Sequence, residues 1–172
     1  MEVKYTTSEC PLGRLLVAST GKGLCMISTG SSDSELEAQL KSRFPSATAK
    51  RDDRGLATLR RSVESRIRGK SLDENLPLDL RGTPFQMSVW SEMLKIPAGS
   101  TRSYAEVARR IGRPRAFRAV AQACGANPVP IVVPCHRVVA SGGKLGGYTG
   151  GIEKKLVLLA GEGVSNPSWP TA

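Results

Sequence analysis

The stretch NPVPIVVPCHRVV, residues 127–139, constrains the fold more than any other part of this chain. Its three prolines fix the backbone angle φ, remove backbone donors and disfavour helical geometry in the residues before them. The segment is therefore predicted to be stiff and non-helical. It holds Cys135 directly beside His136, which is the only histidine of the chain. A rigid backbone that holds a thiol next to an imidazole can support chemistry at the sulfur.

The first 80 residues predict a small α+β lobe. Three apolar or β-branched segments, separated by the turn sequences CPLG and TGKG, are typical of antiparallel strands; they are residues 3–9, 13–19 and 23–29. The spacing of apolar residues then becomes that of a helix over residues 34–44, where Ser34 and Glu37 predict a capping box. Leu56, Leu59, Val63 and Ile67 predict a second helix that ends at Gly69, and residues 75–80 read as one more strand.

From residue 81 onward the pattern of apolar and polar residues predicts helices. Pro84 suits a first helical position, and an apolar stripe follows it. Ser103 and Glu106 predict a capping box for a second helix that ends at Gly112. Pro114 stands where a third helix would begin. Two short helices joined by a glycine-containing turn match a helix-turn-helix.

The charge of the chain is strongly basic, with a net value of +10. Residues 102–118 hold six arginines against one glutamate, and residues 41–70 hold ten Lys and Arg against three Asp and Glu. A solvated basic face and a surface for a polyanion are both consistent with the charge alone. Together with the helix pair, the charge favours nucleic acid as the partner.

The cysteine beside the histidine is predicted to be a nucleophile. A basic neighbour can lower the pKa of a thiol and so produce the reactive thiolate. His136 would be the base, directly or through a water, and Glu162 or Asn127 would orient it. The other cysteines are expected to be small buried hydrophobes: Cys10, Cys25 and Cys124. Downstream, a loop with six glycines surrounds Tyr148, and it is either a ligand-binding loop or a plain surface loop.

Several classes of protein are disfavoured. No apolar run approaches the roughly 18 to 20 residues that cross a bilayer, and the opening MEVKYTTSEC lacks the apolar core of a signal peptide. We therefore expect a cytoplasmic protein with free thiols and no contact with membranes. Without a CxxC pair or a second histidine, we expect no metal and no cofactor.

Three motifs together, NPVPIVVPCHRVV, GYTGG and the closing LLAGEGV, resemble the O6-alkylguanine-DNA alkyltransferases, also called methylated-DNA-protein-cysteine methyltransferases. The segments LPLDLRGTPFQ and SYAEVARRIGRPRAFRAVAQAC look most similar to the alkyltransferase half of the bacterial adaptive-response protein. The resemblance implies an α+β fold, with a small antiparallel sheet and helices of RNase H-like type over residues 1–80. A helical winged helix-turn-helix domain for alkyl transfer and DNA binding would follow over residues 81–164. The tail, residues 165–172, is predicted to be disordered.

The resemblance also implies roles for the residues of the site. Cys135 would accept the alkyl group, His136 would act as a base through a water, and Glu162 would orient His136. Asn127 would tie the helix-turn-helix to the active-site turn. Tyr104 would help to rotate the nucleotide and would donate a proton toward the departing base.

A second group of residues would hold the DNA and the guanine. Arg118 matches an arginine finger that enters the base stack, and Tyr148 would form a wall of the pocket. The Val138 carbonyl and the Thr149 backbone amide would bond the guanine edge. Small residues of the recognition helix would allow close approach to the minor groove, namely Ala116, Ala119 and Ala123. Arg115 and Ser103 complete the predicted contacts with DNA.

The resemblance thus implies DNA repair by a monomer that acts on double-stranded DNA at the nucleoid. An alkyl group would pass from O6 of a flipped-out guanine, or from O4 of thymine, to Cys135. Because nothing is placed to cleave the thioether, each molecule would act once. Three alternatives remain open: a Cys-His hydrolase that turns over, a non-catalytic binder of alkylated DNA, and a plain helix-turn-helix regulator.

Overall fold

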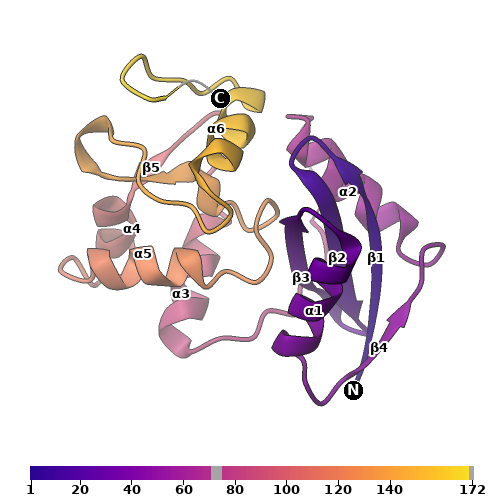
Figure 1. The fold of residues 1–172 in the computed structure, drawn as a ribbon. Helices are drawn as coiled ribbons and strands as arrows, with labels where there is room; N and C mark the ends of the chain where they lie inside the picture. Colours follow the sequence, from indigo (N-terminus) through magenta and orange to yellow (C-terminus); the bar gives the residue numbers. More distant parts are fainter. Residues whose placement is uncertain (71–74, 171–172) are drawn as a thin grey trace. The chain divides into compact units, whose positions relative to one another are not determined.

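The computed structural model describes residues 1–70 and 75–170. The chain divides into two compact units, Met1–Leu80 and Arg81–Ala172. Figure 1 shows a sheet with helices in the first unit and mainly helices in the second. The α+β class predicted from the sequence is confirmed, because the long strands lie in the first unit and most helical residues in the second.

The sheet of the first unit has the order β3-β2-β1-β4. Its strands are β1 (Glu2–Cys10), β2 (Gly13–Thr20), β3 (Gly23–Gly30) and β4 (Thr48–Arg51). The first three pair antiparallel, as their turn sequences predicted. The fourth was not predicted, and it adds to β1 in the parallel direction. A Cβ at Gly13 would lie 2.7 Å from the Gly30 carbonyl oxygen, so the turn between β1 and β2 requires glycine.

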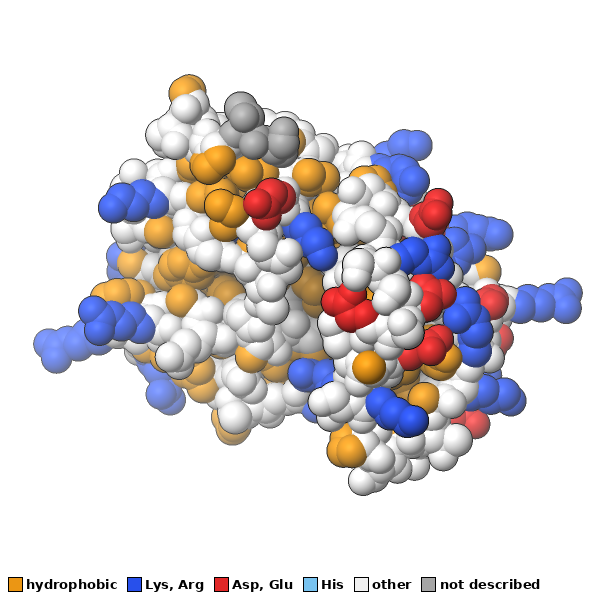
Figure 2. Space-filling view, in the orientation of Figure 1, with side chains coloured by type: hydrophobic (Ala, Val, Ile, Leu, Met, Phe, Trp, Pro, Cys, Tyr) orange, Lys and Arg blue, Asp and Glu red, His pale blue; other side chains and the backbone are white. Residues whose placement is uncertain are grey.

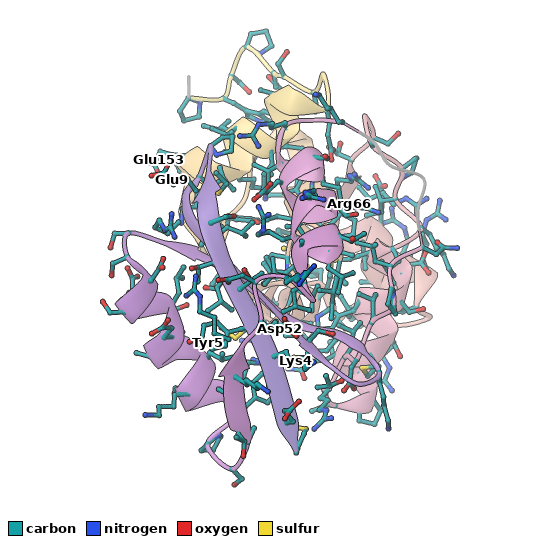
Figure 3. All side chains as sticks on the ribbon, turned by 90° about the vertical axis from the view of Figure 1, so that its right-hand side faces the viewer. Lys4, Tyr5, Glu9, Asp52, Arg66 and Glu153 are labelled. Carbon is teal, nitrogen blue, oxygen red and sulfur yellow. The ribbon has the colours of Figure 1, made fainter. Side chains whose placement is uncertain are left out.

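Helices cover the two faces of this sheet. Tyr5 of β1 donates to Glu37 (3.1 Å) in α1 (Asp33–Arg43), whereas Ser8 donates to Glu64 (2.6 Å) in α2 (Ala57–Ile67). Odd and even residues of a strand point to opposite faces, so the two helices lie on opposite sides of β1 (Figure 3). The core between α1 and the sheet consists of Val3, Leu16, Ala18, Cys25, Met26, Leu36 and Leu40.

Two local predictions for this unit are wrong. The first helix is capped by Ser32, whose side chain accepts from the Glu35 backbone (3.3 Å), and not by Ser34. Residues 75–80 form a single bridge, Leu24 to Leu78, in place of a strand. Pro77 has no backbone donor, so this segment cannot continue a ladder.

The second unit is built on packed helices. They are α3 (Pro84–Met93), α4 (Tyr104–Arg110), α5 (Phe117–Gly125) and α6 (Ile152–Gly161), with the one-turn helices η1 (Cys135–Arg137) and η2 (Ser141–Gly143). Trp90 is 1% exposed and its indole N–H donates to the Ala123 carbonyl (2.9 Å), which ties α3 to α5. Two short strands, β5 (Arg102–Ser103) and β6 (Val138–Val139), pair in parallel. This pairing links the start of α4 to the segment after η1.

The caps of these helices largely follow the sequence. Pro84 occupies the first turn of α3, and the Ser103 hydroxyl accepts from the Glu106 backbone (3.1 Å) at the start of α4. The prediction that the third helix begins at Pro114 is wrong. A turn closed by the Ala116 N–H on the Arg113 carbonyl (2.9 Å) delays it to Phe117. The two helices are thus joined by a longer turn than expected.

The last described residues contact the second unit through Trp169. Disorder was predicted for residues 165–172; residues 165–170 are described, and residues 171–172 lie outside the described residues. Trp169 donates to the Gly143 carbonyl (2.8 Å) and packs beside Leu145 and Leu159. Within residues 1–70 and 75–170, no helix has the length and apolar character needed to cross a membrane.

Candidate functional site

Cys135 begins the one-turn helix η1 and is 8% exposed. A turn closed by the Val133 N–H on the Val129 carbonyl (2.9 Å) precedes it, and the Cys135 N–H bonds the Val133 carbonyl (2.8 Å). Inside this turn Ile131 adopts a φ of 76°, a left-handed conformation that costs a β-branched residue about 1 to 2 kcal/mol. The backbone around the thiol is therefore held in one unusual shape.

Asn127 fixes this turn from the end of α5. Its side-chain amide donates to the Val133 carbonyl (2.8 Å), and its side-chain oxygen accepts from the Val129 N–H (2.9 Å). Both bonds are local replacements for regular secondary structure, which the prolines prevent. Asn127 lies two residues after the last residue of α5, so it joins that helix to the cysteine turn.

His136 faces a carboxylate with one ring nitrogen. Its Nε2 lies 2.9 Å from Oε1 of Glu162, which follows directly after α6, and the His136 side chain is only 2% exposed. Its Nδ1 is buried and has no hydrogen-bond partner in the described part of the chain. A histidine that donates from Nε2 to a carboxylate keeps its lone pair on Nδ1, where it can accept a proton.

Arg137 completes this arrangement, and the sequence interpretation missed it. Its Nη2 donates to Glu162 Oε1 (2.6 Å), its Nε approaches both carboxylate oxygens (3.0 and 3.1 Å), and its Nη1 donates to the Ile96 carbonyl (2.7 Å). Burial alone would raise the pKa of Glu162, but hydrogen bonds from His136 and Arg137 lower it to about 2. In the sequence Arg137 lies between His136 and Val138. Only its contact with Glu162 in the structure shows that it helps to hold that carboxylate.

Burial keeps Cys135 and His136 neutral. It raises the pKa of the Cys135 thiol, although a hydrogen bond from Asn127 and the nearby Lys155 ammonium act in the opposite direction. Burial also lowers the pKa of His136, against the effect of Glu162. At neutral pH both groups are therefore uncharged, and a thiolate forms only when a proton leaves Cys135.

Lys155 is a second residue that the sequence interpretation missed. Its side chain is fully buried, and its ammonium donates to the carbonyls of Val138 (2.8 Å), Leu145 (2.7 Å) and Gly147 (3.0 Å). Burial lowers its pKa to about 8. One cation thus holds β6 and the glycine-rich loop against α6. In the sequence it looks like any lysine of an amphipathic helix.

A pocket of about 360 Å³ opens beside the thiol. Its lining consists of Tyr104, Ala121, Cys124, Gly125, Cys135, Gly147, Tyr148 and Thr149. Burial raises the pKa of Tyr104 to about 12 and also raises that of Tyr148, so both phenols keep their protons. Gly146 has a φ of 75°, and a Cβ there would lie 2.9 Å from the Tyr104 hydroxyl, so the loop needs glycine to pass this wall.

Of the predicted contacts with guanine, Tyr148 and Thr149 line this pocket, whereas Val138 and the predicted contacts with DNA are not among its lining residues. Thr149 is at the rim, where its hydroxyl donates to the Gly125 carbonyl (3.0 Å). The Val138 carbonyl already accepts from Lys155. Arg115 is exposed in the turn before α5, and Arg118 is exposed in the first turn of that helix, whereas Ser103 serves as the cap of α4.

The small residues of α5 divide into two groups. Ala119 is half-buried, and so is Ala116 at the helix start. Ala123 is 2% exposed and accepts the indole hydrogen bond of Trp90, so the prediction that it faces DNA is wrong. Ala119 and Ala123 are four residues apart, but the 2% exposure of Ala123 shows that it belongs to the core.

The positive charge is concentrated in the second unit. Residues 81–172 carry twelve Lys and Arg against four Asp and Glu, whereas residues 1–80 carry thirteen against eleven. Basic side chains of the first unit are partly neutralised by ion pairs such as Arg14 with Asp33 (2.8 Å) and Arg60 with Glu64 (2.7 Å). In Figure 2 most of the red acidic side chains lie over the first unit.

Comparison with known proteins identifies two matching domain families. Residues 84–164 match the 6-O-methylguanine DNA methyltransferase, DNA binding domain, and residues 3–80 match the ribonuclease-like domain of the same protein. Among curated proteins, the bifunctional transcriptional activator/DNA repair enzyme Ada of Escherichia coli is 42% identical over 94% of this chain. The chain spans only 46% of the length of that relative.

Two further relatives match this chain over most of its length and over most of their own length. The inducible methylated-DNA--protein-cysteine methyltransferase of Bacillus subtilis is 41% identical over 83% of this chain and 80% of its own length. The crystal structure of Mycobacterium tuberculosis OGT in complex with DNA superimposes with a TM-score of 0.76 at 37% identity, over 94% of this chain and 92% of that one.

Proposed function

Because this chain belongs to the 6-O-methylguanine DNA methyltransferase family, we propose that it repairs DNA by taking an alkyl group from O6 of guanine onto its own Cys135. The observation that carries the proposal is the arrangement of Cys135, His136 and Glu162 beside a pocket of about 360 Å³. The pocket is walled by two tyrosines and holds the thiol on its surface. It is suited to a flat base with a substituent directed at sulfur.

The first step is the loss of the thiol proton. His136 accepts it on Nδ1 through a water, and Glu162 stabilises the imidazolium through the 2.9 Å contact with Nε2. The nearby Lys155 ammonium favours the thiolate. The sulfur then attacks the alkyl carbon in line with the carbon–O6 bond, so an S–C bond forms as the C–O6 bond breaks.

The electron pair of the broken bond stays on guanine, which must gain one proton. Tyr104 is protonated, since burial raises its pKa to about 12, and its position at the pocket wall suits it to pass a proton to the departing base. The imidazolium of His136 restores that proton. Overall one proton moves from Cys135 to guanine, and the product is a thioether that no neighbouring group can hydrolyse. Each molecule therefore acts once.

The guanine edge would be read by main-chain groups of Val138 and Thr149. A carbonyl has two lone pairs, so the Val138 carbonyl can accept from the guanine amino group while it accepts from Lys155. The Thr149 backbone amide would donate to the base, and Tyr148 would close the pocket. These contacts would hold a guanine whatever the sequence that surrounds it.

A base can reach this pocket only outside the duplex, so the protein must extrude it. We propose that α5 lies along the minor groove, where Ala119 permits close approach and Arg118 fills the space left by the base. Arg115 and the Ser103 cap of α4 would contact phosphates. We propose a monomer that works where DNA is kept, in the cytoplasm at the nucleoid.

The test is the intact mass of the protein after incubation with duplex DNA that carries one O6-methylguanine, followed by peptide mapping. We expect one added methyl per molecule, on Cys135. The Cys135→Ala variant should bind the DNA and gain nothing, while Cys124→Ala, which alters the other pocket thiol, should still gain one methyl. Methyl transfer in the Cys135→Ala variant, continuous turnover by the wild type, or tight binding without any mass change would each contradict the proposal.

A further inference from the structure

Phe117 is an aromatic side chain that the protein leaves in solvent. It is 45% exposed at the first residue of α5. The other exposed large hydrophobic side chains of the described residues are aliphatic: Met1, Met87, Leu94 and Ile152. The chain has only eight aromatic residues. Single exposed hydrophobic side chains are common on protein surfaces, so only the surroundings of this ring can mark it as a contact for a partner.

The position of Phe117 relates it to the pocket. In an α-helix, residues at i, i+4 and i+7 share one face, so Phe117 lies on the same side of α5 as Ala121 and Cys124. Both of those residues line the pocket that holds Cys135. With a rise of about 1.5 Å per residue, Phe117 lies roughly 10 Å along the axis from Cys124. The ring therefore stands on the pocket-facing side of the helix, toward its N-terminus.

Phe117 is paired with the adjacent arginine. The guanidinium carbon of Arg118 lies 5.9 Å from the centroid of the Phe117 ring, within the range of a cation–π contact. Two further arginines, Arg113 and Arg115, are exposed in the turn just before the helix. Ion pairs among the described residues do not involve any of these three arginines. The ring thus sits in a positively charged surface that complements phosphates.

We propose that Phe117 is a second base-stacking element, which enters the duplex beside Arg118 and stacks on a base next to the extruded nucleotide. Apolar side chains inserted between base steps unstack them, and a ring can replace the stacking that the neighbouring base loses. The cation–π contact keeps Arg118 aligned with the ring, so the two side chains act together. This inference rests on the proposed function and adds a residue to it.

The test compares alkyl transfer to Cys135 from two substrates, duplex DNA with one O6-methylguanine and a free O6-alkylguanine base. The free base needs no extrusion. Phe117→Ala should slow the duplex reaction by roughly 5- to 150-fold, the effect expected from one lost base–aromatic stack, and leave the free base unaffected. Phe117→Trp should restore the duplex rate. Leu94→Ala, which removes a side chain of equal exposure (45%) on the C-cap of α3, should change neither rate.

A second readout reports extrusion directly. In a Cys135→Ala background, which binds without reacting, 2-aminopurine at the lesion position should become bright as it leaves the stack. Adding Phe117→Ala should reduce that signal at saturating protein. Equal slowing on both substrates, or no change on either, would overturn the role of Phe117 while the wild type still transfers its alkyl group. If the wild type transfers nothing to Cys135, the proposed function fails and this inference fails with it.

Discussion

The carboxylate of Glu162 offers the sharpest test of the site, because its environment predicts both a stability and a pH dependence. It is 6% exposed and binds two cationic or donor groups, His136 Nε2 at 2.9 Å and Arg137 Nη2 at 2.6 Å. The Glu162→Gln substitution keeps the shape of the side chain and removes its charge. Arg137, itself only 13% exposed, then keeps a charge with no carboxylate against it.

The magnitude follows from the pKa. Hydrogen bonds outweigh burial and lower the pKa of Glu162 from 4.5 to about 2. At about 1.4 kcal/mol for each tenfold change in an acid constant, the ionised form gains about 3 kcal/mol on folding. Loss of one partner from a buried pair costs a similar amount, about 3 to 5 kcal/mol. Because the folded pKa is the lower one, this stability is complete above pH 4.5 and is lost as the pH falls toward 2.

The assay is urea unfolding of the wild type and the variant at pH 7 and again near pH 3. We expect Glu162→Gln to lower the free energy of unfolding by about 3 kcal/mol at pH 7, and the difference to shrink as the pH approaches the lowered pKa. Glu153→Gln is the matched control, since Glu153 is an exposed carboxylate in the first turn of α6, the helix that Glu162 follows; it should cost about 0.3 to 1 kcal/mol. A loss below about 1 kcal/mol at pH 7, or one that persists undiminished at low pH, would refute the reasoning.

Three further predictions concern the pocket and the DNA surface. Lys155→Met removes the donor to three carbonyls and should slow transfer from a free O6-alkylguanine base at least as much as from duplex DNA, because the free base is held by the pocket alone; a rate measured on both substrates checks this. Arg118→Ala should slow the duplex reaction by about 10-fold or more and spare the free base, and equal slowing would count against a role in extrusion. Binding to duplex DNA should weaken with salt, with a log–log slope of about −0.9 for each phosphate neutralised, and a flat titration would show that the charge of the second unit does not carry binding.

Local patterns predicted the fold wherever neighbours in the sequence decide it. Alternation and turn chemistry located the first three strands, and Pro84 and Ser103 marked helix starts correctly. The fourth strand, β4, has four exposed residues and no alternation, so only its pairing with β1, more than 40 residues away, defines it. The cap at Ser32 was missed because Ser34 offers the same chemistry two residues later.

The sequence predicted those residues of the site that belong to one contiguous motif. Cys135 and His136 are neighbours in the sequence, and the structure brings Glu162 to them from 26 residues away. Lys155 could not be recognised, because its three acceptors are backbone carbonyls 8 to 17 residues before it, and its burial arises only when β6 and the glycine-rich loop fold over α6. Arg137 was overlooked for a similar reason, since nothing local distinguishes a buried arginine from an exposed one.

Under the proposed function, in which each molecule acts once, the burial of Cys135 has a chemical logic. A thiolate held permanently at the surface would react with any electrophile, and each such reaction would consume one molecule. Here burial disfavours both the thiolate of Cys135 and the imidazolium of His136, so the resting pair is neutral. The Glu162 carboxylate and the Lys155 ammonium are nevertheless in place to stabilise the charges as they form. In the proposed reaction, the thiolate would therefore form only when a base fills the pocket and holds an alkyl carbon against the sulfur.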